Sequence, residues 1–104
     1  MLKLVAVTAC PSGVAHTYLA AESLEVAAKK LGINIFVETQ GSIGIENALT
    51  DEAIQEADAV ILTNAIAIKN EDRFKGKPVL RVSPADCIKK AEVICKKLQT
   101  KLSK

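Results

Sequence analysis

Cys10 stands where a cysteine side chain can act as a nucleophile. It follows the apolar run LKLVAVTA, which is typical of a strand buried on both faces, and precedes a helical pattern that begins at Val14. The first turn of a helix carries backbone N–H groups without intrahelical acceptors, and its positive dipole end favours anions. Such surroundings lower the pKa of a thiol and hold a phosphate. From this context alone, Cys10 is expected to be either an activated cysteine beside an anion-binding loop or a buried structural thiol.

The residues after Cys10 have the composition of a phosphate-binding loop. In order they are Pro11, Ser12, Gly13, Val14, Ala15, His16 and Thr17. Gly13 lets the backbone approach an anion without a Cβ in the way, and the hydroxyls of Ser12 and Thr17 offer further donors. His16 is the only histidine. Because Cys10 already supplies the nucleophile, we expect His16 to contact phosphate rather than to relay it.

The other two cysteines indicate neither a disulfide framework nor a metal site. Cys87 and Cys95 form no CxxC pair, and they fall eight residues apart in an expected helix. Eight helical residues rise about 12 Å, whereas the Cα atoms of a disulfide lie within about 7 Å. We therefore expect both to be small packing residues in a reducing compartment, with no metal and no cofactor.

The composition favours one globular domain over residues 1–104, because domains usually hold about 100 to 150 residues. Apolar residues make up 49% of the chain and aromatic residues 3%, and the net charge is +2. This small charge, with few aromatic side chains, argues against nucleic-acid binding. The lysines near the end of the chain indicate the solvated face of a last helix. No signal peptide or membrane-spanning stretch is recognisable, so a cytoplasmic location is expected.

Strand and helix patterns alternate along the chain. Strands are expected at residues 2–9, 33–39, 58–63 and 78–82, and helices at 14–31, at 50–57 and from 84 onward. Gly32, Thr50 and Ser83 are expected to end the first helix and to cap the second and third. Residues 64–77 are compatible with either a short helix or a loop.

This order predicts an α/β fold with an open, mainly parallel four-stranded sheet flanked by helices, a Rossmann-like sandwich with strand order 2-1-3-4. Ligands of such sheets bind beyond the carboxyl ends of the strands, where the strand order reverses, and Cys10 falls at that point. Gln40, Gly41 and Ser42 end the second strand at the same sheet edge. They are expected either to shape a docking surface or to serve packing and turn formation.

Three segments together resemble one family. CPSGVAHTYLAAESLE, VETQGSIGIENALT and ADAVILTNAIAI, at matching intervals, resemble the fructose-specific EIIB component of the bacterial sugar phosphotransferase system over nearly the whole chain. The family's loop is usually written CPTGVAHT, so this sequence departs at Ser12 but keeps a hydroxyl there. The resemblance implies that Cys10 is the phosphorylated cysteine and that residues 11–17 bind the phosphoryl group.

The resemblance also implies the partners. The donor would be a phosphohistidine on an EIIA domain, and the acceptor would be a sugar, fructose by resemblance, held by the membrane component EIIC. The chain would then be a protein-phosphohistidine–sugar phosphotransferase that EIIC recruits to the inner face of the membrane.

Two alternatives use the same loop. A small cysteine phosphatase would need a Cys-x5-Arg pattern, but the sixth residue after Cys10 is His16. A non-catalytic anion-binding module has no motif of its own here, because the GxGxxG and GxxxxGK[ST] patterns are absent.

Overall fold

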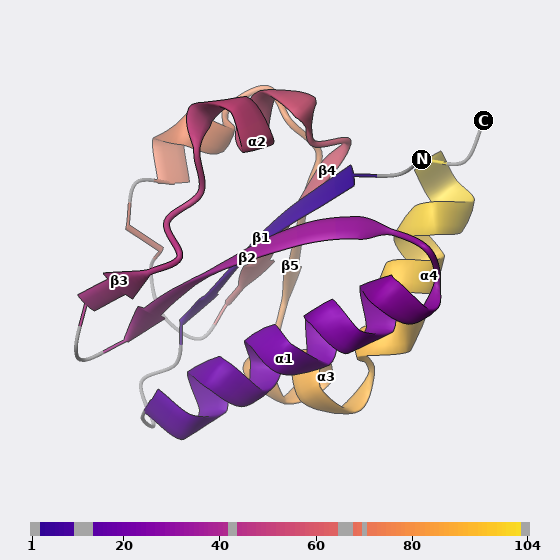
Figure 1. Cartoon of the computed structure of the whole chain (residues 1–104), viewed down its shortest axis with the longest axis horizontal. Helices are drawn as coiled ribbons and strands as arrows, with labels where there is room; N and C mark the ends of the chain where they lie inside the picture. The colour runs from indigo at the N-terminus through magenta and orange to yellow at the C-terminus, as the bar shows by residue number, and fades with distance from the viewer. Residues whose placement is uncertain (1–2, 10–13, 42–43, 65–67, 70, 103–104) are drawn as a thin grey trace.

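Five strands form one sheet in the order β3-β2-β1-β4-β5 (Figure 1). The structure, a computed structural model, describes residues 3–9, 14–41, 44–64, 68–69 and 71–102. The strands are β1 (Lys3–Ala9), β2 (Asn34–Gly41), β3 (Gly44–Glu46), β4 (Ala59–Thr63) and β5 (Val79–Val82). The helices are α1 (Val14–Lys30), α2 (Asp51–Glu56), the 3-10 helix η1 (Glu71–Phe74), α3 (Pro84–Lys89) and α4 (Ala91–Leu102).

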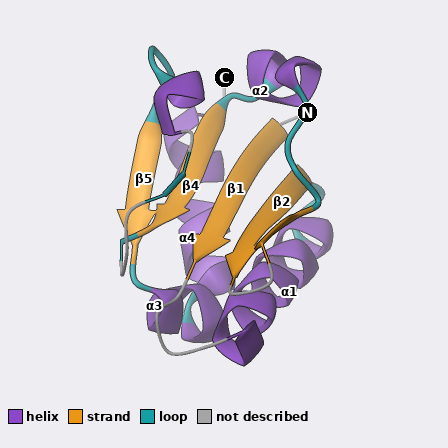
Figure 2. Cartoon of the chain, turned by 90° about the vertical axis from the view of Figure 1, so that its left-hand side faces the viewer, coloured by secondary structure: helices purple, strands orange, loops and turns teal. Residues whose placement is uncertain are grey.

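The predicted α/β class is confirmed, and the four predicted strands keep their predicted order. β2, β1, β4 and β5 are parallel and point the same way (Figure 2). The prediction was wrong in counting four strands, because β3 pairs antiparallel with the end of β2 at the sheet edge. This strand spans only three residues and lacks a buried face, so no apolar alternation marks it in the sequence.

Each face of the sheet carries its own apolar core. On the face covered by α1, α3 and α4, Leu4 and Ala6 pack with Leu24 and other buried residues of these helices. On the opposite face, Val5 and Val7 pack with residues that include Ile54 of α2 and Phe74 of η1. β1 and β4 are buried on both sides, which explains their nearly continuous apolar sequence.

The predicted helix boundaries are confirmed at three positions. Thr50 caps α2 by accepting a hydrogen bond from the Ala53 N–H, and Ser83 caps α3 in the same way from Asp86, at 3.1 Å each. After α1, Gly32 adopts φ +73°, a left-handed conformation that glycine accepts without steric cost.

The expected single last helix is two helices. Lys90 ends α3, with its N–H bonded to the Asp86 carbonyl, and its own carbonyl then accepts the first hydrogen bond of α4 from Ile94. The break changes the direction of the chain so that Cys87 and Cys95 both enter the same core. The expected distance between these cysteines, calculated from the rise along one helix, therefore does not apply. Both cysteines are nevertheless free thiols, as predicted.

The segment that the sequence left open contains a short helix, η1, within 64–77. Among the described helices, none combines the length and the apolar character that crossing a membrane requires.

Candidate active site

The candidate site lies at the carboxyl ends of the parallel strands, where β1 ends at Ala9 and α1 begins at Val14. Cys10, Pro11, Ser12 and Gly13 lie outside the described residues, as does Ser42. The backbone of Val14, Ala15 and His16 forms the first turn of α1. The predicted arrangement, a strand followed closely by a helix, is thus present. The described residues at the two ends of the loop show how its ends are held.

The two ends of the 10–16 segment are joined at its base. The Thr8 hydroxyl, on β1, donates a buried hydrogen bond of 3.1 Å to the Thr17 carbonyl in α1. Thr17 is 1% exposed, and its own hydroxyl has no hydrogen-bond partner within the described part of the chain. A buried hydroxyl without a partner costs free energy, so it marks a place where a polar ligand gains a donor. This placement favours the predicted role of Thr17.

Ala9, the residue before Cys10, is held from the neighbouring strand. The Thr63 hydroxyl accepts from the Ala9 N–H at 2.9 Å and donates to the Ala9 carbonyl at 3.0 Å. Thr63 is buried at the end of β4. A hydroxyl can serve both backbone groups because it is both donor and acceptor. The chain therefore enters the loop from a fixed residue.

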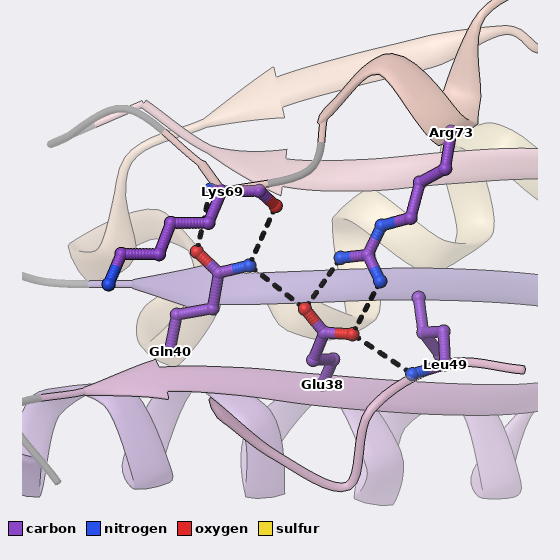
Figure 3. A network of polar contacts seen from close by, with 5 residues as sticks. All are labelled: Glu38, Gln40, Leu49, Lys69 and Arg73. Carbon is purple, nitrogen blue, oxygen red and sulfur yellow. Dashed lines mark hydrogen bonds and ion pairs between the residues drawn. The ribbon is translucent and has the colours of Figure 1, made fainter. Parts of the chain in front are cut away.

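A buried carboxylate organises the other side of the site (Figure 3). Glu38, on β2, is fully buried, and both its oxygens accept bonds from the Arg73 guanidinium, at 2.7 and 2.5 Å. It also accepts from the Leu49 N–H and from the Gln40 side chain, at 2.9 Å each. Burial would raise the pKa of Glu38, but the bonds from Arg73, Gln40 and Leu49 hold that pKa below its usual value.

Gln40 connects this carboxylate to the segment after β4. Its amide accepts from the Lys69 N–H at 2.8 Å and donates to the Lys69 carbonyl at 3.0 Å. With 6% exposure, the Gln40 side chain serves packing, which favours the second of the two roles that the sequence left open. Docking at Gly41 and Ser42 stays a prediction.

Sequence reasoning did not identify Thr63, Glu38, Arg73 or Lys69. One signal was available for Glu38, because a charged residue at an inward position of a strand is rarely buried without a partner. The partner, Arg73, is 35 residues away along the chain, and no local pattern connects them. Within the described residues, no cluster of His, Cys, Asp or Glu could hold a metal ion.

The two C-terminal cysteines are unsuited to nucleophilic chemistry. Both are completely buried, and desolvation raises the pKa of Cys87 to about 12, with a further contribution from Asp86, and that of Cys95 to about 11. Since the thiolate is the nucleophile, neither thiol is reactive near neutral pH.

We expect iodoacetamide at pH 7.5 to leave Cys87 and Cys95 unmodified in the folded protein and to label both in denaturant. Mass spectrometry of peptides after timed quenching measures each thiol separately. We expect Cys10 to react first, with a pKa below the usual value of about 8.5. If Cys87 or Cys95 reacted faster than Cys10 in the folded chain, the reactive thiol would be misassigned.

Comparison with known proteins identifies relatives along nearly the whole chain. The family model described as "PTS system, Lactose/Cellobiose specific IIB subunit" matches residues 5–97. The PTS system fructose-like EIIB component 2 of Escherichia coli K12 is 57% identical over 103 residues, which cover 99% of this chain and 97% of that protein. The 2-O-alpha-mannosyl-D-glycerate-specific EIIABC component of the same strain is 48% identical over 97 residues, 93% of this chain but 15% of that longer protein.

Solved structures show the same fold. A domain of the fructose-specific IIABC component of Borrelia burgdorferi is 57% identical, with a TM-score of 0.87 over 92% of this chain and 91% of that one. The Enzyme IIB subunit of a PTS system from Escherichia coli K12 is 39% identical, with a TM-score of 0.92 over 98% and 94% of the two chains.

Proposed function

Because the chain belongs to the IIB family of the sugar phosphotransferase system, and so takes part in phosphoryl transfer during sugar uptake, we propose that Cys10 is the residue that carries the phosphoryl group. The observation that supports this role most directly is the place of Cys10 in the chain, between two elements that the structure describes. Cys10 follows Ala9, at the carboxyl end of a central strand, and precedes a helix, whose first turn has backbone N–H groups without intrahelical acceptors.

Two transfers make up the proposed reaction. In the first, the Cys10 thiolate attacks the phosphorus of a phosphohistidine, so that an S–P bond forms as the N–P bond breaks and the histidine nitrogen takes up a proton. In the second, a sugar hydroxyl attacks, an O–P bond forms, the S–P bond breaks and the hydroxyl proton is released. The thiolate is regenerated, and no electron is gained or lost. Both transfers depend on positioning and on stabilisation of charge.

The described residues support a loop built for positioning. Thr8 ties the two ends of the 10–16 segment together, and Thr63 holds Ala9. The buried Thr17 hydroxyl is available as a donor. Since near-attack geometry in such transfers requires reacting atoms within about 3.5 Å, a fixed entry and exit of the loop contribute directly to rate.

Partners are inferred from the relatives. Among these, an EIIABC component and a fructose-like EIIBC component of Escherichia coli K12 join their EIIB segment to further components in one chain. We infer that this chain accepts its phosphoryl group from an EIIA domain and delivers it to sugar on a membrane-embedded EIIC component. It would act at the cytoplasmic face of the membrane.

The sugar is proposed to be fructose or a close analogue. The family model carries a lactose/cellobiose description, whereas the 57% identical relative is named fructose-like. A relative with high identity over its full length is the better guide to a substrate than a family-wide description, because one fold hosts many specificities.

The test is a reconstitution with phosphoenolpyruvate, the general phosphotransferase proteins and candidate EIIA domains. We expect one phosphoryl group per chain, mapped by mass spectrometry to Cys10, and its transfer to fructose when membranes with the matching EIIC are added. Phosphate mapped to another residue, such as His16, would overturn the proposed carrier.

A further inference from the structure

A cation beside the phosphoryl site would add to the stabilisation that the backbone N–H groups of its loop offer. A phosphoryl group carries close to two negative charges, and its transfer is stabilised by lysine, arginine or metal ions placed around it. The segment from residue 10 to residue 17 contains neither lysine nor arginine. Any lysine or arginine of this chain that acts there must come from a segment that the fold brings to the same sheet edge.

Lys69 is brought to that edge by Gln40. The Gln40 side chain binds both the N–H and the carbonyl of Lys69, and Gln40 itself stands opposite Ala9 in the register of β1 and β2. In the view of Figure 3, the Lys69 side chain extends past Gln40 and away from Glu38 and Arg73, in the direction in which the strands run. Lys69 is exposed, so its ammonium group can reach a ligand.

The hydrogen bonds that place Lys69 have a fixed direction. The Glu38 carboxylate only accepts, so the amino group of the Gln40 amide must face it. The carbonyl oxygen of the same amide is then left to receive the Lys69 N–H. Arg73 in turn fixes Glu38 through two hydrogen bonds, so the positive charge of Arg73 is already paired with that carboxylate. The series of hydrogen bonds from Arg73 through Glu38 and Gln40 therefore ends at the backbone of Lys69.

We propose that Lys69 is a catalytic residue whose ammonium group binds the phosphoryl group as it arrives on Cys10 and as it leaves. This inference rests on the proposed role of Cys10. An ammonium is a strongly hydrated point charge without the two-pronged geometry of arginine. It stabilises charge during transfer without clamping the group as the arginine of a phosphatase loop would. That property suits a carrier that must release its cargo.

The test compares three variants in single-turnover transfer from a phosphorylated EIIA domain. Lys69→Met removes the charge and keeps a long side chain, and Lys69→Arg restores a charge. Lys75→Met is the matched control, because Lys75 is also exposed and this substitution removes the same charge. Lys75 lies in the turn before β5, at the opposite end of the sheet.

We expect Lys69→Met to slow transfer about tenfold to a hundredfold. A donor in a closed site contributes about a hundredfold to a thousandfold, and exposure to water reduces this effect. Lys69→Arg should recover most of the rate, and Lys75→Met should match the parent protein. Thermal unfolding should be unchanged in all three.

A second measurement separates charge stabilisation from a structural role. The rate of Cys10 alkylation across pH reports the pKa of that thiol, and loss of a nearby ammonium should raise it in Lys69→Met but not in Lys75→Met. If the parent protein is phosphorylated on Cys10 but Lys69→Met keeps its rate and its alkylation profile, this inference is wrong and the proposed function stands. If the parent protein takes no phosphate on Cys10, the proposed function itself fails.

Discussion

Replacement of Cys10 with serine is expected to lower phosphoryl acceptance by more than about ten-thousandfold, in the range seen when an enzyme loses its nucleophile. Serine keeps the size of the side chain, but its hydroxyl does not ionise near neutral pH, so the attacking anion is lost. The measurement is transfer of labelled phosphate from EIIA to the purified variant, with its folding checked by thermal unfolding.

Cys87→Ala and Cys95→Ala are the matched controls for that experiment. Both thiols are buried on the α1 face of the sheet, and each truncation should cost about 1 kcal/mol of stability. Both variants should accept phosphate at the parent rate. Loss of acceptance in a well-folded Cys87→Ala protein would contradict the assignment of the site to Cys10.

Replacement of Arg73 with leucine is expected to lower the free energy of unfolding by about 3 kcal/mol, near the lower end of the range for breaking a buried ion pair. The cost arises because Glu38, fully buried, would lose the cation that stabilises its charged form. The lower end applies because the Arg73 side chain is 20% exposed, so water already screens part of the pair. Urea denaturation at pH 7 measures the difference.

Glu38→Gln provides the pH-dependent counterpart. In the parent protein, the lowered pKa of Glu38 contributes stability that is fully present above the unfolded-state pKa of about 4.3 and is lost as pH falls through the folded-state value. In Glu38→Gln, the free energy of unfolding should therefore fall less steeply as the pH is lowered below about 5. If the free energy of unfolding of this variant fell with pH as in the parent protein, the neighbours of Glu38 would not be lowering its pKa as described.

Much of this architecture follows from local sequence. The apolar strands, the caps at Thr50 and Ser83 and the turn at Gly32 each depend on residues near one another. The order of the four parallel strands was predictable because alternating strands and helices, joined by right-handed crossovers, allow few arrangements. The edge strand β3 and the break at Lys90 were not, because three residues without an apolar pattern, and a helix interrupted within an amphipathic repeat, leave little local signal.

The candidate site divides in the same way. Cys10 and Thr17 stand in one short motif, and a sequence pattern can identify them. Thr63, Glu38 and Arg73 act on the site through bonds between residues 35 to 54 positions apart. Such pairs depend on which strands become neighbours, so only the folded chain brings them together.

The buried carboxylate of Glu38 also distinguishes the correct alignment of β2 from incorrect ones during folding. Side chains alternate between the faces of a strand, so a slip of one residue would turn Glu38 away from Arg73 and into the apolar layer that contains Val37 and Leu24. No cation is buried in that layer among the described residues. A misaligned β2 would therefore bury an unpaired charge, and this penalty disfavours the very misfolded states that hydrophobic burial alone would tolerate.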